Sequence, residues 1–349
     1  MAASQPELKI IELDSVIDTL LSSSQPSIRY KTRLHILGES PTSRPLKRLT
    51  AEIRQSALAR CLLQNQQADG RITAPSGVYA KWQGAHWIMA ALADTGYPGG
   101  DRSLLPIRDQ LQEQWLSETY FEEFEAPSKP MAYRRNGVPV MQGRHRRCAS
   151  QQANALWSIL RLGLAGKKTH EFVERLLHWQ WPDGGWNCDK NPDAAHSSFM
   201  ESILPLRALA LYAQLYSDRR AGDAAGLASE IFLKRHLFSR QTDGSVMKAE
   251  FTLLHYPLYW HYDFLHGLKV LAESGFIQDP RCVPALVLLA DKQLPGGGWP
   301  AEKKYYRTSG KVALGHDFVD WGPTGRKRMN PWVTLDALIV LRSAGRLPG

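Results

Sequence analysis

The sequence predicts an all-α fold, a single α/α toroid of five to six helix pairs in which residues 1–349 form one domain. Helical periodicity runs through the whole chain, and strand-like alternation is nearly absent. A helix–turn–helix pattern also recurs at a spacing of roughly 55 to 65 residues, which is typical of a repeat architecture. Because one helix pair cannot bury both of its faces, such pairs have to stack on one another.

One segment recurs four times, each time at the end of an amphipathic helix that a glycine turn closes. The four copies read LLQNQQADGRI (62–72), LLHWQWPDGGW (176–186), HLFSRQTDGSV (236–246) and LLADKQLPGGGW (288–299). The equivalent glutamines are Gln66, Gln180 and Gln293, and the tryptophans that close the two best copies are Trp186 and Trp299. We expect a scaffold role, in which the amide bonds the backbone of the turn and the indole packs under the next helix.

A more apolar helix follows each copy, within residues 79–98, 196–212, 259–275 and 330–345. A wider apolar face marks these helices as the inner, more buried members of each pair. A fifth pair is expected from residues 103–124 and 148–165. Residues 1–44 are expected to supply N-terminal helices that complete the barrel, and residues 45–345 to form the repeat region. In a toroid all inner helices run the same way, so their N-termini gather at one end.

Composition and charge narrow the class of protein. The net charge is +9, but the basic residues are scattered and no nucleic-acid motif accompanies them, so we expect no nucleic-acid partner. No apolar run predicts a transmembrane helix, while the positive charge leaves peripheral contact with an acidic membrane open. The N-terminus has no signal-peptide pattern and the four cysteines lack CxxC spacing, so we expect reduced thiols in a cytoplasmic protein. The sequence identifies no partner subunit.

The repeats resemble those of the terpenoid-cyclase and protein prenyltransferase superfamily, in which Gln is followed by Gly and Trp. QWPDGGW and QLPGGGW match this squalene-cyclase-like QW repeat well, whereas QQADGRI and RQTDGSV are less complete copies. The resemblance covers most of residues 45–345 and implies a toroid enzyme with a central cavity. The Asp-x-Asp-Asp and Asp-Asp-x-x-Asp motifs of the family's cyclases are missing. The length is closer to the catalytic subunit of a protein prenyltransferase, which would have a partner subunit.

Acidic and imidazole side chains at the expected inner-helix N-termini are the candidate catalytic residues: His196, Glu201, His261, Asp263 and Asp189. Burial in an apolar cavity raises the pKa of a carboxyl group, which suits proton transfer near neutral pH. Glu201 stands in the otherwise apolar segment FMESILPLRALALY, where a carboxylate is costly unless it is paired. Ion pairs and hydrogen-bonded core histidines are the alternative interpretation of these residues.

Aromatic, cationic and amide side chains at the same helix ends are the candidate substrate-binding residues. They are Lys81, Trp82, His86, Gln151, Trp186, Tyr256, Trp260, Tyr305, Tyr306 and Trp332. Cations, hydroxyl groups and helix N-termini suit a phosphate or carboxylate group, and aromatic faces suit a hydrocarbon or a carbocation. An ordinary packed core uses the same aromatic residues.

Zinc is the cofactor that the sequence suggests, with Cys188, His196 and His261 as three ligands. Asp189 or Asp263 would then bind the ion or orient a ligand. The resemblance points the same way, because protein prenyltransferases bind zinc through Asp, Cys and His at the starts of inner helices. His196 falls at the position of that family's Cys, and Ala194, which cannot bind a metal, at that of its Asp. A hydrogen-bonded histidine and a buried thiol explain the residues without a metal.

We therefore expect a cyclase- or transferase-like enzyme that acts on a largely apolar, isoprenoid-like or anionic-headed small molecule. Its chemistry would be acid/base or metal-assisted. Two alternatives stay open from the sequence. One is a toroid enzyme of different chemistry, such as a carbohydrate-active hydrolase or lyase with paired carboxylates. The other is a binding scaffold without catalysis.

Overall fold

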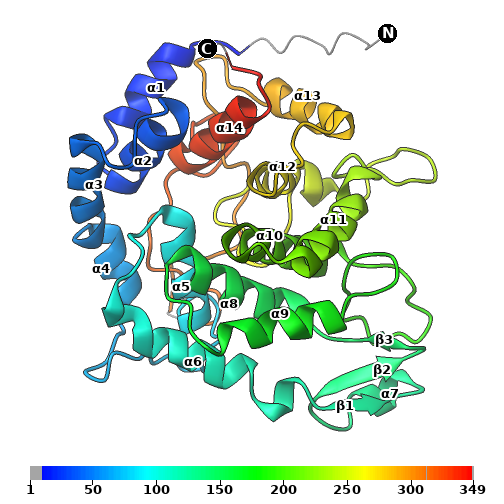
Figure 1. Ribbon diagram of the computed structural model, residues 1–349. Helices are drawn as coiled ribbons and strands as arrows, with labels where there is room; N and C mark the ends of the chain where they lie inside the picture. The colour runs from blue at the N-terminus through cyan, green and yellow to red at the C-terminus, as the bar shows by residue number, and fades with distance from the viewer. Residues whose placement is uncertain (1–9, 312, 348–349) are drawn as a thin grey trace. The chain divides into compact units, whose positions relative to one another are not determined.

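Helices dominate the chain, as the periodicity predicts (Figure 1). The computed structural model describes residues 10–311 and 313–347. They form two compact units: the first comprises the residues up to Gln64, Thr95–Pro98 and the residues from Leu233 onward, and the second comprises Asn65–Asp94 and Gly99–Phe232. Within the described residues, no helix has both the length and the apolar character that crossing a bilayer requires.

The first unit contains helices from both ends of the chain. They are α1 (Leu13–Leu21), α2 (Pro26–Lys31), α3 (Arg44–Arg54), α4 (Ala57–Leu63), α12 (Phe264–Glu273), α13 (Val283–Asp291) and α14 (Pro331–Ser343). A π-helical turn follows α2 at Thr32–Ile36, and 3-10 turns cover Ala249–Thr252 and Pro280–Cys282. The helices α12 and α14, both predicted as inner helices, pack against each other. Of residues 1–44, which were expected to supply N-terminal helices, residues 1–9 lie outside the described residues.

The second unit holds the remaining helices and a small sheet. Its helices are α5 (Ala85–Thr95), α6 (Leu105–Trp115), α7 (Lys129–Ala132), α8 (Ala149–Arg161), α9 (Thr169–His178), α10 (Phe199–Tyr216) and α11 (Arg219–Leu233), of which α5 and α11 each end one residue inside the first unit. Its strands are β1 (Glu123–Glu125), β2 (Val138–Met141) and β3 (Arg144–His145), and 3-10 turns cover Arg102–Leu104 and Glu118–Tyr120.

The three-stranded sheet corrects the expectation of a single helix over residues 103–124. The helix α6 ends at Trp115, and β1 then pairs in parallel with β2, which pairs antiparallel with β3. A tight turn joins β2 to β3, and its two central residues, Gln142 and Gly143, both have positive φ, as such hairpin turns require. Strands this short carry too few alternating residues to produce a sequence signal.

Two of the predicted inner helices, α8 and α10, lie side by side and run in the same direction (Figure 1). Ser150 and Glu201, in the first turns of the two helices, are hydrogen-bonded at 3.1 Å. About two turns farther along both helices, the Arg207 guanidinium lies 3.6 Å from the centroid of the Trp157 ring. Contacts that advance together along both helices require parallel axes. The N-termini of α8 and α10 therefore lie at the same end of the second unit.

The second copy of the repeat, residues 176–186, connects the end of α9 to the start of α10 through hydrogen bonds; we call such a connection a joint. The side-chain amide of Gln180 donates to the carbonyl of Gly184 at 2.7 Å, as predicted, and so holds the turn. Trp186 is 1 % exposed, and its indole N–H donates to the carbonyl of Leu176 at 2.9 Å. Its backbone N–H donates to the hydroxyl of Ser202, the fourth residue of α10, at 3.0 Å. These bonds tie the end of one helix to the start of the next.

The fourth copy repeats this joint between α13 and α14. The indole of Trp299 donates to the carbonyl of Leu289 at 2.7 Å, and its backbone N–H donates to the hydroxyl of Thr334 at 2.8 Å. Thr334 is the fourth residue of α14, the position that corresponds to the hydroxyl residue of the other copy. Gln293 differs from the prediction, because its amide bonds both backbone groups of Ile11 instead of its own turn. In both copies the glutamine side chain therefore bonds backbone groups, but those of its own turn in one copy and those of an N-terminal segment in the other.

Candidate functional site

Two thiols and a carboxyl group meet where α8 and α10 begin. Cys148 immediately precedes α8, Glu201 lies in the first turn of α10, and Cys188 lies in the loop that follows the second repeat. One ligand atom from each residue lies within 4.8 Å of the others, and the sulfur of Cys188 is 3.4 Å from an oxygen of Glu201. We call these three residues the thiol–carboxyl cluster. The parallel course of α8 and α10 brings it together.

The Glu201 carboxyl group is held by the start of α8. Its Oε2 atom accepts the backbone N–H of Ser150, a favourable place for negative charge because a helix N-terminus carries partial positive charge. Burial nevertheless raises the pKa of Glu201 above its ordinary value, against the lowering effect of the Ser150 and thiol hydrogen bonds. The hydrogen bond with Cys148, burial and the nearby Glu201 together raise the pKa of Cys188. The cluster therefore holds protons more tightly than the same groups do in water.

A cationic and a phenolic side chain flank the cluster. The guanidinium of Arg147 lies 4.2 Å from the centroid of the Tyr120 ring. Its Nε and Nη2 atoms are buried and have no hydrogen-bond partner among the residues that the structure describes. Tyr79, which shares a hydrogen bond with Gln151, is close enough for the charges of the cluster to act on it, and burial raises its pKa. Gln151, predicted to bind substrate, thus stands next to the cluster.

One turn into α8, Gln152 presents a second polar group without a partner. Its side chain is fully buried, and neither its amide nitrogen nor its amide oxygen has a hydrogen-bond partner within the described ranges. Leaving such a group unpaired in a protein interior costs about 1–3 kcal/mol. Unpaired buried polar atoms at the start of α8 are consistent with a site that a polar ligand completes.

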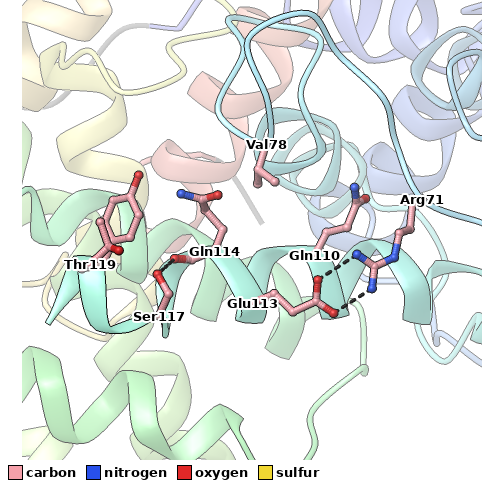
Figure 2. Close-up of a pocket in the computed structure, with 8 residues that line it drawn as sticks. Arg71, Val78, Gln110, Glu113, Gln114, Ser117 and Thr119 are labelled. Atoms are coloured by element: carbon pink, nitrogen blue, oxygen red, sulfur yellow. Dashed lines mark hydrogen bonds and ion pairs between the residues drawn. The ribbon is translucent and has the colours of Figure 1, made fainter.

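A hollow of about 430 Å³ lies on the α6 side of the second unit, and Figure 2 shows its lining. Gln110, Glu113 and Gln114 project from α6, and Val78 faces them from the loop that precedes α5. Tyr120 also lines the hollow, and its ring is the one on which Arg147 stacks. The hollow thus adjoins the cationic flank of the thiol–carboxyl cluster.

The opposite end of the hollow is closed by an ion pair. Arg71 donates two parallel hydrogen bonds to Glu113, at 2.7 and 2.8 Å (Figure 2). The residues that line the hollow are Arg71, Val78, Gln110, Glu113, Gln114, Ser117, Thr119 and Tyr120. None of them is among the site residues that the sequence predicted.

The first unit holds a separate group of predicted residues around Asp263. The carboxylate of Asp263 accepts the backbone N–H of His266 at 2.8 Å and so caps α12. It also accepts the backbone N–H of His255 at 2.9 Å and lies 3.3 Å from the Nδ1 atom of that residue. The Tyr305 ring stacks on His255 and on His261, with centroids 4.4 and 3.5 Å apart. Its role as the N-terminal cap of α12 accounts for Asp263 without a catalytic role.

Several other predicted residues are packed in aromatic pairs, of which Trp260 with His261 is only half-buried. Trp82 contacts Trp87 edge to face, and Tyr256 stacks on Trp332 at 5.3 Å between centroids. Trp260 stacks on His261 at 4.0 Å. Buried aromatic pairs of this kind stabilise a fold by about 0.5–1.5 kcal/mol beyond the area that they bury. Their packing accounts for these residues in each unit without a bound substrate.

Of four further predicted residues, two lie at the surface and two contact neighbouring side chains. Asp189 and His196 are exposed; Asp189 accepts the backbone N–H of Asn191, and the carbonyl of His196 accepts the amide of Asn187. The ammonium of Lys81 lies 5.6 Å from the Trp82 ring centroid. Tyr306 is buried, and burial raises its pKa to about 12.

His86, predicted to bind substrate, lies in the core of the second unit. It is 1 % exposed, accepts the indole N–H of Trp115 at 3.1 Å and is hydrogen-bonded to Asn154 at 3.0 Å. Burial lowers its pKa to about 3. A ring held in this way is a neutral structural element and not a group that meets substrate.

We expect the His86 ring to stay neutral when the pH falls from 8 to 5. Because its folded pKa is depressed, its contribution to stability is present above the unfolded value of 6.5 and is lost as the pH falls toward 3. Nitrogen-15 NMR of labelled histidine measures the protonation, with His86→Gln to assign the signal. Titration of His86 near pH 6.5 would show that the ring is solvated.

Two groups of potential metal ligands exist among the described residues. One is the thiol–carboxyl cluster, and the other consists of Glu123, His145 and His178. The zinc ligands predicted from the sequence, Cys188 with His196 and His261, are not one of these groups. The structure instead places Cys188 with Cys148 and Glu201.

No family model matches this sequence, and no curated protein matches it either. The sequence pattern indicated part of the cluster, because Glu201 stands at an expected inner-helix start and Cys188 in the loop that leads to it. Gln151, beside the cluster, was also predicted. Cys148 begins the expected helix 148–165 but was not among the predicted ligands, and Arg147 lies one residue before that helix.

Proposed function

We propose that the chain is an enzyme, terpenoid-cyclase- or prenyltransferase-like, that acts on a largely apolar small molecule with an anionic head. The observation that carries the proposal is the thiol–carboxyl cluster, where burial raises the pKa of Glu201 beside two thiols. Groups of this kind serve as general acids or bases when their pKa values approach the working pH. The single α/α toroid of five to six helix pairs remains the fold that we propose for the chain.

In this proposal each residue around the cluster has one task. Glu201 holds and transfers the proton, and the Ser150 N–H stabilises the carboxylate when the proton has left. Arg147 offers a phosphate or carboxylate head two buried nitrogens that bond no other group within residues 10–311 and 313–347. Tyr79 and Gln151 form a hydrogen-bonded pair that orients the phenol beside the cluster.

A metal-assisted version of the same site is the second candidate. Two sulfur atoms and one carboxylate oxygen within 4.8 Å of one another are a donor set that zinc accepts, with three protein ligands and one open position. Bound zinc would polarise a substrate oxygen as a Lewis acid. Elemental analysis of the purified chain beside the Cys188→Ser variant separates the two versions, because only the second requires an equivalent of zinc that this variant loses.

The carbohydrate-active and scaffold alternatives have less support. A paired-carboxylate mechanism would use Asp189 or Glu201 with Asp263, but Asp263 caps α12 and Asp189 holds a loop turn. A pure scaffold leaves unexplained why Arg147 nitrogens and the Gln152 amide have no hydrogen-bond partner in the described part of the chain.

The test is binding and conversion of isoprenoid diphosphates and of neutral polyprenes by the full chain. We expect the diphosphates to bind more tightly, and Arg147→Gln to weaken their binding by about 10- to 100-fold, the value of a hydrogen bond to a charged group. Arg161→Gln, on the exposed end of the same helix, is the matched control. Calorimetric titration and product analysis are the measurements. If neither class of compound binds or reacts, the proposed function is wrong.

A further inference from the structure

Two histidines and a glutamate converge beside the sheet of the second unit, apart from the thiol–carboxyl cluster. The Nε2 atom of His178 lies 2.8 Å from one carboxylate oxygen of Glu123, and the Nε2 atom of His145 lies 3.2 Å from the other. The two imidazole rings are 4.6 Å apart between centroids. Each oxygen of a single carboxylate therefore faces the nitrogen of a different imidazole.

Three separate elements position these side chains. Glu123 begins β1 and is paired with Val138, His145 ends β3 and is paired with Val140, and His178 is the last residue of α9. Because β2 lies between the other two strands, the sheet sets the separation of Glu123 and His145. Residues far apart in the sequence are thus brought together by regular backbone, which favours a precise site.

The indole groups of two tryptophans that follow α9 donate hydrogen bonds to Glu123 and His145. The indole N–H of Trp179 donates to Glu123 Oε1 at 3.4 Å, and that of Trp181 donates to the carbonyl of His145 at 2.9 Å. A hydrogen bond to a ligating carboxylate, like that of Trp179, orients metal ligands in known sites, whereas the Trp181 bond fixes the backbone of His145. Arg135 does not compete for the carboxylate, because it donates to the backbone carbonyl of Glu123 and pairs with Glu122.

We propose that Glu123, His145 and His178 bind a divalent transition-metal ion of the zinc class. Their ligand atoms all lie within 4.8 Å of one another, so an ion between them replaces the hydrogen-bonding protons with three bonds. The imidazole Nε2 atom and the carboxylate are ordinary zinc ligands, and three protein ligands leave one position for water. The His178 side chain is 60 % exposed and that of Glu123 is 37 % exposed, which opens that position to solvent. Imidazole ligands select zinc, cobalt or nickel over magnesium and calcium.

The test is titration of the chelator-treated full chain with Zn²⁺, with Co²⁺ as a spectroscopic probe and Mg²⁺ as the comparison ion. We expect one Zn²⁺ per chain at this site and no comparable binding of Mg²⁺. Glu123→Gln and His178→Ala are each expected to weaken zinc binding by more than about tenfold, since even loss of an outer hydrogen bond costs that much. His170→Ala, an exposed histidine near the start of the same helix, is the matched control and should bind zinc unchanged.

The spectrum of the cobalt form separates this site from the thiol–carboxyl cluster. Nitrogen and oxygen ligands give no thiolate-to-cobalt charge-transfer band, and the site should persist in Cys188→Ser. His178→Asp keeps a possible ligand and should recover part of the affinity that His178→Ala loses, with the helical circular dichroism unchanged in both. Zinc binding that is insensitive to Glu123→Gln and His178→Ala, or that disappears in Cys188→Ser, would overturn the proposal. These outcomes are independent of the proposed enzymatic function.

Discussion

Glu201→Gln is expected to lower turnover by about 10²- to 10⁴-fold, the range that a positioned general acid or base contributes. Glutamine keeps the volume of the side chain and still offers an oxygen to the Ser150 N–H. It removes the ability to gain or lose a proton, and its NH2 group replaces the oxygen that accepts from the Cys188 thiol. Turnover is measured on the compound that the unmodified chain converts, and Glu171→Gln, an exposed glutamate on α9, is the control.

The pH dependence adds a second readout for Glu201. Because burial raises its pKa, the limb of the rate profile that Glu201 controls should lie above the ordinary value of 4.5 and vanish in Glu201→Gln. A general acid loses activity as the pH rises through this limb, and a general base gains it. Unchanged turnover and an unchanged profile in the variant would leave Glu201 as a cap of α8 and nothing more.

The stability of the variant follows from the same shift. A carboxyl group whose folded pKa is raised contributes stability that is present below its unfolded pKa and is lost as the pH rises through the folded value. Above that value the unmodified chain carries the cost of a buried charge, which glutamine does not have. Loss of activity in Glu201→Gln at neutral pH is therefore not expected to result from unfolding.

Trp186→Ala is expected to lower the free energy of unfolding by about 3–5 kcal/mol, the usual cost of removing a fully buried Trp side chain. The indole is 1 % exposed and bonds the carbonyl of Leu176, so the variant leaves both a cavity and an unpaired acceptor. Chemical denaturation, followed by circular dichroism, measures the change.

Two variants make the Trp186 result specific. Trp186→Phe keeps most of the ring volume and loses the hydrogen bond, so a cost of about 1 kcal/mol is expected. Val246 holds the corresponding position in the third copy of the repeat but is 46 % exposed, so Val246→Ala should change stability by less than about 0.5 kcal/mol. If Trp186→Ala were as stable as the unmodified chain, the scaffold role of the repeat would be wrong.

The helical elements could be predicted because their signals are local. Apolar periodicity located α10, α12 and α14 within a few residues of their ends, and the glycine turns located the ends of α9 and α13. The three-stranded sheet was missed, because β1 and β3 are too short to show alternation. Its strands are defined by their pairing, which no single segment reveals.

The location of the thiol–carboxyl cluster could be predicted from the sequence, but the set of residues that form it could not. Placing reactive residues at inner-helix starts selected Glu201, Cys188 and Gln151, which lie in or beside the thiol–carboxyl cluster. The same rule included His86 and Trp186, which the structure places in the core with structural hydrogen bonds. A residue type at a helix start does not say which way its side chain points, and that direction separates a site from a core.

The sequence by itself determined the mostly helical pattern and the glycine turns that end the helices, since these depend on residues close together in the chain. Only the tertiary structure decided which side chains meet. Cys148 and Cys188 are 40 positions apart, and Glu123, His145 and His178 come from three elements, so their proximity depends on how α8, α9, α10 and the sheet pack. The raised pKa of Glu201 and the lowered pKa of His86 likewise arise from burial. Burial depends on the surrounding fold and cannot be read from the residue type.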